Sequence, residues 1–587
     1  MTMTDVLFIN ATSYLSMNQE ANGTLLLATK LLQDGFEAQI LRFAEIETSP
    51  KDYDAFIREF TGRILDMQPR CVSFYTLWPY YHIMLRIAAQ LRQEAPHILL
   101  VLGGPQASAT AEATLKAMPF IDYICTGEGE NTVVPFFRAL LRPDGPALEE
   151  IPGLYYRADG KILCNSQPVP LCDLDTLPYW DDRLYQTVLD QSRPYLTSKN
   201  YFMPIDAGRG CPYSCTFCCS SYFWKRMYRL KSPQRIVEDI RYYNSRFGIN
   251  SFWFSHDAFT SNKKLVAQVC DRILEEGLKI RWRCSARVDC ITEDLVLKMK
   301  ESGMTEIELG IETGSKRMQK LINKNLDLEK ARHMIDFLLK NKIHVSLFFM
   351  YGFPDETEED LNQTLELAFD LVDRGVQKVS MFFCRFNPTT AITEQYLDRL
   401  VLDTDVTALH RGVNGYWEEL DMIRQNRELF PFLYHLHTPV RDRYHFLFLL
   451  MYLYQKCPRG IRHLRRLYKG DNLRFYREFC EKNAFLFGLG FEYAVRTARE
   501  RTAEVFCNVL DGFNEPYIPQ LKGLMQFEFD SKQVFSSQED CTVRRTYDFS
   551  YIDYKLGLPV ENYSQGRTEI ELSKIGGVKN LHVLSIN

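Results

Sequence analysis

Three cysteines on one short stretch constrain this chain more than any other feature. Cys211, Cys215 and Cys218 follow a C-x3-C-x2-C spacing within the run Gly-Cys-Pro-Tyr-Ser-Cys-Thr-Phe-Cys-Cys. Three thiolates on one loop suit three corners of a [4Fe–4S] cube, whereas ferredoxin-type clusters use four cysteines. Zinc sites favour two separated ligand pairs, and no matching second pair lies nearby. The spacing therefore predicts a cluster whose fourth iron is open to a small molecule.

The first 200 residues predict an α/β domain and a connector. In residues 1–150, short apolar runs alternate with helical patterns and lead into glycine-rich turns at 103–105 and 127–130. This alternation predicts a Rossmann-like, doubly wound parallel sheet, with ligands at the carboxyl ends of its strands. Residues 151–200 are expected to form a connector, with a hairpin around 159–160.

Strands and helices alternate again over residues 201–400. Six βα units are fewer than the eight of a complete TIM barrel. The expected strands are 202–206, 251–255, 280–286, 306–311, 344–350 and 378–383, and two of the helices are 233–247 and 263–276.

The last part of the chain, 401–587, has a different pattern. It is expected to be mainly helical, with a buried helix over 446–454 and a small β-containing tail. The tail is inferred from alternating runs at 527–529, 547–549 and 570–572.

Composition limits the classes of protein and partner. The chain has 587 residues, which favours three or four domains. A net charge of −5 gives no sign of a nucleic-acid surface. The longest apolar run is too short to span a membrane. Sixteen scattered cysteines and a first segment resembling a buried strand lead us to expect a reducing, cytoplasmic setting without disulfides.

Three further motifs follow the cysteines. They are Ser-His-Asp at 255–257, Gly-Ile-Glu-Thr-Gly-Ser at 310–315, and Gly-Phe-Pro-Asp-Glu-Thr at 352–357. Together with the glycine-rich turns before residue 150, they resemble the cobalamin-dependent radical S-adenosylmethionine (SAM) enzymes over residues 1–400. That resemblance implies a cobalamin-binding Rossmann-like domain and a partial (β/α)6 barrel. It also implies a [4Fe–4S] cluster, SAM and cobalamin as cofactors.

The resemblance implies contacts between SAM and residues at the barrel strand ends. Arg287 suits the SAM carboxylate, with a salt bridge to Asp289 as the alternative. His256 stands where many relatives have Asp, and is either a proton relay or a polar residue at a strand end. Cys219 is either a hydrogen or proton donor or a buried thiol. The implied SAM-binding residues are Ser255, Asp257, Arg287, Glu312, Ser315 and Gly352.

The resemblance also implies cobalamin contacts at the N-terminal strand ends. The Asp-x-His-x-x-Gly motif that supplies a cobalt-ligating histidine in some cobalamin domains is absent, and the first histidine is His82. Cobalamin is therefore expected with its tail base detached. The loop at 75–78 either covers the lower face of cobalt or packs against the protein. The implied residues are Thr76, Leu77, Gly103, Gly104, Gln106, Ser108, Gly127, Glu128, Gly129 and Glu130.

The resemblance implies that a 5′-deoxyadenosyl radical removes a hydrogen atom from an unactivated carbon of the substrate. The resulting substrate radical then receives a methyl group from methylcobalamin. A cyclase or rearrangement enzyme without methyl transfer is one alternative, and a non-enzymatic Fe–S sensor or electron carrier is another. The expected partners are a small-molecule or peptide substrate and an external low-potential electron donor. Residues 401–587 are expected to act as a substrate lid. A group of arginines in this part either binds an anionic substrate or forms a solvent-exposed helix face (Arg462, Arg465, Arg466 and Arg474).

Overall fold

The computed structural model describes residues 4–12, 22–44, 53–192, 202–403, 418–487, 497–537, 541–556, 560, 563, 566–575 and 578–586. The chain divides into two compact units. The first comprises Met1–Glu308, Ile322–Lys324 and Arg385–Leu436, and the second comprises Leu309–Leu321, Asn325–Cys384 and His437–Asn587.

A seven-stranded sheet of order β2-β1-β3-β4-β5-β6-β7 forms the start of the first unit. The first five strands in this order are parallel, and the last two add antiparallel. β1 carries a continuous apolar run at 6–9, which is buried because helices cover both faces of the sheet. The strands are β1 (Thr4–Thr12), β2 (Ala38–Ala44), β3 (Pro69–Tyr75), β4 (Leu99–Gly103), β5 (Tyr123–Cys125), β6 (Leu154–Ala158) and β7 (Lys161–Cys164).

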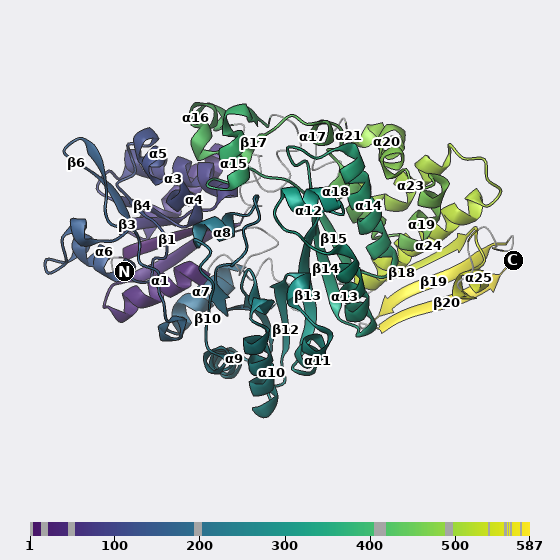
Figure 1. Cartoon of the computed structure of the whole chain (residues 1–587), viewed down its shortest axis with the longest axis horizontal. Helices are drawn as coiled ribbons and strands as arrows, with labels where there is room; N and C mark the ends of the chain where they lie inside the picture. Colours follow the sequence, from purple (N-terminus) through teal and green to yellow (C-terminus); the bar gives the residue numbers. More distant parts are fainter. Residues whose placement is uncertain are drawn as a thin grey trace. The chain divides into compact units, whose positions relative to one another are not determined.

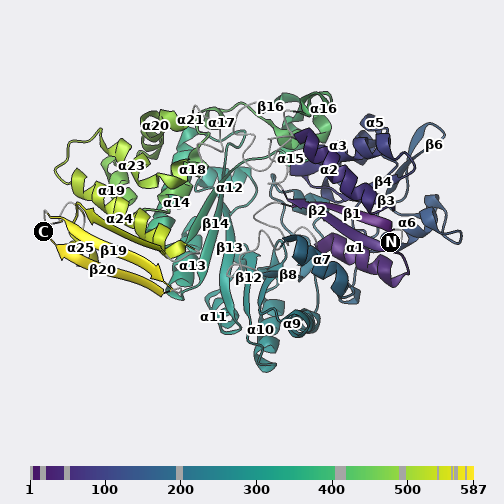
Figure 2. The same cartoon turned by 180° about the vertical axis from the view of Figure 1, so that it is seen from behind.

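Helices lie on both faces of this sheet, as Figures 1 and 2 show. Helix α1 contacts α6 and α7 on one face, while α2 contacts α3 on the other. The doubly wound arrangement predicted from the sequence is therefore confirmed. The helices are α1 (Asn22–Gln33), α2 (Tyr53–Asp66), α3 (Tyr81–Glu94), α4 (Pro105–Ala109), α5 (Ala111–Ala117), α6 (Val133–Leu141) and α7 (Asp182–Ser192).

A six-stranded sheet of order β15-β14-β13-β12-β11-β8 follows. The strand pairs β8–β11, β11–β12 and β14–β15 are parallel. The division between the two units falls within β13. The six predicted strands are all present, in an order with two open edges. They are β8 (Met203–Asp206), β11 (Ser251–Ser255), β12 (Arg281–Ala286), β13 (Met304–Glu312), β14 (His344–Tyr351) and β15 (Lys378–Phe383).

Local signals explain the helices between these strands. Ser232 caps the first turn of α9 by accepting a hydrogen bond from the backbone of Arg235, and Pro233 occupies the first turn. Gly248, with φ of 66°, ends the helix. The helices are α9 (Pro233–Phe247), α10 (Lys263–Glu275), α11 (Glu293–Glu301), α13 (Leu328–Lys340) and α14 (Glu358–Asp373).

The C-terminal part of the second unit packs helices against a small antiparallel sheet of order β18-β19-β20. Helix α24 contacts β18 and β19 on one side and α19 and α23 on another (Figure 2). The elements are α18 (Leu447–Tyr454), α19 (Pro458–Leu467), α20 (Asn472–Lys482), α23 (Thr502–Leu510), α24 (Ile518–Ser536), β18 (Cys541–Tyr547), β19 (Thr568–Ile575) and β20 (Val578–Ile586). No helix within the described ranges is long and apolar enough to cross a membrane.

One expectation about the tail is wrong. Residues Phe527 and Phe529, interpreted as part of an alternating β run, lie within α24. Both are buried, as is the intervening Glu528, because α24 is surrounded by protein and shows no single apolar stripe. The Glu528 carboxylate accepts hydrogen bonds from the backbone of Arg459 and Gly460, which lie in the first turn of α19.

Candidate functional site

A two-stranded ribbon closes the loop that carries the three cysteines. Strands β9 (Gly208–Arg209) and β10 (Arg229–Leu230) pair antiparallel and form the stem of this loop. Gly210, which follows the first stem strand, has φ of 82°, and a Cβ there would lie 1.7 Å from the carbonyl oxygen of Met227. Only glycine fits such a close backbone approach.

The three cysteines lie on this loop between the two stem strands. Cys215 is buried, whereas Cys211 and Cys218 are partly exposed. Burial raises the pKa of Cys211 and raises the pKa of Cys218 to about 11. Both thiols must therefore release protons when they bind metal. Three thiols on one loop fit three irons of a [4Fe–4S] cluster, and all sixteen cysteines, each within the described residues, are free of disulfides.

Arg287, just after β12, braces the cluster loop. Its guanidinium makes a two-point ion pair with Asp289, with Nε–Oδ1 and Nη2–Oδ2 distances of 3.0 and 2.9 Å. It also donates to the carbonyl oxygen of Lys324 at 2.9 Å and lies 3.9 Å from the ring centre of Tyr213. Its Nη1 is 3.8 Å from the sulfur of Cys215. The structure thus shows the Asp289 salt bridge, and a SAM contact for Arg287 stays a prediction.

The polar segment after β11 lies in the same unit. Nδ1 of His256 accepts a hydrogen bond from the Ala258 backbone at 2.8 Å. Burial lowers the pKa of His256. Because Nδ1 is the acceptor of this hydrogen bond, a neutral imidazole here would carry its proton on Nε2. Asp257 accepts a hydrogen bond from the Ser220 hydroxyl, which connects this segment to the cluster loop. Ser255 is the last residue of β11.

Cys219 begins the short helix α8 (Cys219–Phe223), directly after the third cluster cysteine. Burial raises the pKa of this thiol well above its usual value. A protonated thiol fits the buried-thiol alternative and does not test hydrogen donation.

Three of the predicted SAM residues belong to the second unit, and two of them, Glu312 and Ser315, lie at the end of β13. Glu312 is buried, with φ of 68°, a left-handed conformation uncommon for a residue other than glycine. The hydroxyl of Ser315 donates to Asp360, so it fastens this turn to the start of α14. Asp360 also receives the guanidinium of Arg317.

The turn after β14 depends on a buried carboxylate. Oε2 of Glu356 accepts backbone hydrogen bonds from Gly352 and Phe353 at 2.5 and 3.3 Å. Gly352 has φ of 79°, which the turn requires. Complete burial raises the pKa of Glu356 to about 8. The structure supports the tight-turn interpretation of Gly352 and leaves its SAM contact untested.

Thr76 connects two strand ends of the N-terminal sheet. Its hydroxyl donates to the carbonyl oxygen of Gly103 at 2.7 Å and accepts from the Ala107 backbone at 2.9 Å. A Cβ on Gly104, whose φ is 92°, would lie 3.0 Å from the backbone N and O atoms of Thr76. The second glycine of this turn is therefore required by the protein's own backbone.

The next predicted cobalamin residues also contact protein. Gln106 is buried and donates its amide to the carbonyl oxygen of Leu429 at 2.8 Å. The Ser108 hydroxyl accepts from the Gly127 backbone at 3.0 Å. Leu77, partly exposed, precedes the short helix Trp78–Tyr80.

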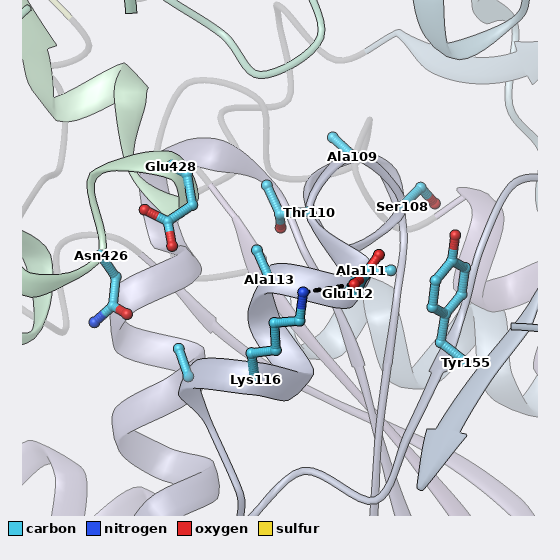
Figure 3. Close-up of a pocket in the computed structure, with 11 residues that line it drawn as sticks. Ser108, Ala109, Thr110, Ala111, Glu112, Ala113, Lys116, Tyr155, Asn426 and Glu428 are labelled. Atoms are coloured by element: carbon cyan, nitrogen blue, oxygen red, sulfur yellow. Dashed lines mark hydrogen bonds and ion pairs between the residues drawn. The ribbon is translucent and has the colours of Figure 1, made fainter. Parts of the chain in front are cut away.

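A cavity of about 680 Å³ lies beside α4 and α5 (Figure 3). Small side chains line one side of it, and Asn426 and Glu428 line another. Ser108 is the one predicted cobalamin residue in this lining. The other predicted cobalamin residues do not line this cavity, so it does not test the predicted cobalamin site.

The turn after β5 contacts the stem of the cluster loop. The carboxylates of Glu128 and Glu130 form ion pairs with Arg209, and Glu128 also pairs with Arg229. The glycines of this turn lie against protein side chains, since a Cβ would meet Pro168 from Gly127 and Leu27 from Gly129. Corrin contacts for these four residues remain predictions.

Sequence reasoning missed the two stem arginines and the buried Glu356. The two glutamates in the turn after β5 could have indicated these arginines, because buried carboxylates require cationic or hydrogen-bonding partners. Their positions, more than 70 residues further along the chain, gave no indication of the pairing.

Comparisons with known proteins agree with this arrangement. The Radical SAM superfamily model matches residues 205–368, and the B12 binding domain model matches residues 16–136. An uncharacterized methyltransferase of Pyrococcus horikoshii is 31% identical over 318 residues, which are 54% of this chain and 66% of that protein. An anaerobic magnesium-protoporphyrin IX monomethyl ester cyclase of Rubrivivax gelatinosus is 27% identical over 316 residues, covering 52% and 55%. The matched region thus spans about half to two thirds of these relatives' length.

A solved structure extends the similarity of fold over most of the chain. The cobalamin-dependent SAM radical enzyme OxsB, with aqua-cobalamin bound, gives a TM-score of 0.55 at 13% identity, covering 96% of this chain and 85% of that one. The chain thus combines a B12 binding domain with a three-cysteine loop in a radical SAM region, the combination that the cobalamin-dependent radical SAM enzymes share. Solved structures of this fold hold these groups: TsrM from Kitasatospora setae carries cobalamin and a [4Fe–4S] cluster, and OxsB carries aqua-cobalamin and SAM.

Proposed function

We propose that this enzyme methylates an unactivated carbon of a small-molecule or peptide substrate. The observation that carries the proposal is that one compact unit holds both the B12-binding sheet and the cluster loop. When bound, the cluster and SAM supply a hydrogen-abstracting radical, and cobalamin supplies a methyl carrier. The methyltransferase relative adds support.

In this proposal the chain positions its cofactors and shields the reaction. Cys211, Cys215 and Cys218 hold three irons, and Arg287 holds the loop through Tyr213. The polar segment after β11 and the turns after β13 and β14 are proposed to hold SAM. The turns after β3, β4 and β5 are proposed to hold cobalamin through their backbone.

The division into functional regions is also proposed. Residues 1–150 would hold cobalamin, 151–200 connect, and 201–400 hold the cluster and SAM. Residues 401–587 would contact substrate. In the structure, 385–436 belong to the first unit and 437–587 to the second. An external low-potential electron donor would reduce the cluster.

The experiment that tests methylation is anaerobic reconstitution with cobalamin, methyl-deuterated SAM, reductant and cell extract. Mass spectrometry then follows S-adenosylhomocysteine, 5′-deoxyadenosine and the labelled product. Methylation requires S-adenosylhomocysteine and a product carrying the deuterated methyl group. Formation of 5′-deoxyadenosine and product without either would contradict it.

A cyclase without methyl transfer is the second candidate. The observation in its favour is the similarity to the Rubrivivax gelatinosus cyclase, which covers much the same share of this chain as the methyltransferase match. The same experiment separates the two candidates, because a cyclase would consume SAM without forming S-adenosylhomocysteine.

A further inference from the structure

The two arginines of the loop stem face each other across the ribbon. Arg209 and Arg229 are register partners in the antiparallel pair β9–β10. Their side chains are 10% and 14% exposed, so solvent screens their repulsion poorly. Like charges opposite each other destabilise a strand pair. The ribbon therefore needs anionic partners.

Carboxylates of the turn after β5 supply these partners. Glu128, 5% exposed, contacts both arginines, with Oε2 at 3.4 Å from Nη1 of Arg209 and 3.2 Å from Nη1 of Arg229. Glu130, 6% exposed, contacts only Arg209, at 2.7 Å. Asp206, the last residue of β8, also pairs with Arg209, with Nη2 at 3.1 Å from Oδ2.

The connector and the loop itself join the same contact. The backbone N–H of Leu171 donates to Glu128 at 3.1 Å, and its carbonyl oxygen accepts from Arg229. The ring of Trp224, within the cluster loop, lies 6.0 Å from the guanidinium of Arg209 and 5.8 Å from that of Arg229. One buried junction therefore joins the B12-binding sheet, the connector and the cluster loop.

We propose that Glu128 and Glu130 are positioning residues that hold the stem of the cluster loop on the turn after β5 and so set the separation between cluster and cobalamin. Arg209 lies two residues before Cys211, so movement of the stem moves the first cluster ligand. The inference rests on the proposed function, because it explains how one unit fixes the distance between two bound cofactors. In this proposal the carboxylates of Glu128 and Glu130 bind the stem arginines and do not contact the corrin ring.

The test uses the full-length protein reconstituted with cluster and cobalamin, without substrate. Reduction gives two paramagnets, the [4Fe–4S]⁺ cluster and cob(II)alamin, whose spin–spin interaction in EPR falls steeply with their separation. Glu128→Gln and Glu130→Gln keep the side-chain shape and remove the charge. Asp239→Asn is the matched control, because Asp239 is a buried carboxylate paired with Lys231 and Arg235 in the same unit.

We expect the spin–spin interaction to weaken, or its EPR signal to broaden, most in Glu128→Gln and less in Glu130→Gln. The Asp239→Asn variant should resemble the wild type. Cobalamin Kd, measured by absorbance, should change by less than about tenfold, which corresponds to about 1.4 kcal/mol. Unchanged interaction in both glutamine variants would overturn the proposal. A larger loss of cobalamin affinity with unchanged interaction would also overturn it and assign the carboxylates to corrin.

If Glu128→Gln does not fold, the milder Glu130→Gln decides the question. None of these readouts requires methyl transfer. Absence of S-adenosylhomocysteine would contradict the proposed methylation and leave this test intact.

Discussion

At the scale of single residues, the cluster loop presents three thiols, Cys211, Cys215 and Cys218, in the spacing of cluster ligands. Each is expected to bind one iron. Changing Cys211, Cys215 or Cys218 to Ala should abolish the cluster's visible absorbance and SAM cleavage. Cys219→Ala, one position further, is the matched control and should keep both. Iron and sulfide analysis measures the outcome, and full cluster content in any of the three variants would remove that residue from the ligand set.

Arg287 should matter for the loop even before SAM binds. Arg287→Met removes the ion pair with Asp289, the hydrogen bond to Lys324 and the contact with the Tyr213 ring. Hydrogen bonds to charged groups contribute about 1.5–3 kcal/mol each, so we expect an unfolding free energy lower by roughly that amount and faster loss of iron.

The matched control for this prediction is Arg283→Met. Arg283 lies over the rings of Phe202 and Trp253 in the same unit. Thermal melts and iron release after chelator addition measure the two variants. Equal iron retention in both would contradict the bracing role of Arg287.

Glu356 predicts a pH dependence whose sign follows from its burial. Burial raises its pKa from 4.5 to about 8, so the folded state binds more protons than the unfolded state between these values. Stability from this group is therefore lost as pH rises through that window. Glu356→Gln should gain stability relative to wild type from about pH 5 to about pH 8, on the order of a few kcal/mol.

Denaturant unfolding at the two pH values measures this difference. The exposed neighbour Glu359→Gln is the control and should show no such trend. A constant difference between Glu356→Gln and wild type across the range would show that Glu356 is ionised in the folded protein.

At the residue level, spacing alone predicts a ligand set for the cysteines, and that set stays a prediction. The sequence offered Asp289 as an alternative partner for Arg287, because the two residues are close in sequence, and the structure shows this ion pair. Prediction from sequence failed for Glu128 and Arg229, which are separated by 101 positions. Such pairs depend on how the sheet and the loop stem fold together, and local pattern does not contain that information.

At the scale of elements, Gly104 allows the turn after β4 to pack closely against the backbone that follows β3. Gly104→Ala would place a Cβ 3.0 Å from the Thr76 backbone while keeping φ of 92°. We expect a loss of more than about 1–2 kcal/mol, the usual cost of a left-handed conformation alone. Gly35→Ala is the control, because Gly35 has φ of 79° and a Cβ added there would meet nothing within 4 Å. Equal losses in the two variants, measured by denaturant unfolding, would contradict the close approach.

Element prediction was accurate where apolar runs were short and bounded by turn residues. The predicted 251–255 and 378–383 strands match β11 and β15 at both ends. The error at 527–529 arose because α24 is buried on several sides, which removes the helical period from its apolar residues.

At the scale of the whole molecule, the sequence indicated a cobalamin-binding sheet followed by a radical SAM barrel. Contacts in the folded chain add that 385–436 belong to the first unit and that the division runs within β13. Sequence order alone does not reveal such a division, because the long-range contacts of each segment determine it.

The central claim is that this chain holds cobalamin together with a cluster whose open iron binds SAM. The most direct measurement is EPR of the anaerobically reconstituted full chain, reduced and recorded with and without SAM, alongside quantification of cobalamin after desalting. The account predicts retained cobalamin and a cluster spectrum that changes when SAM is added. A cluster spectrum indifferent to SAM, or a protein that retains no cobalamin, would contradict it.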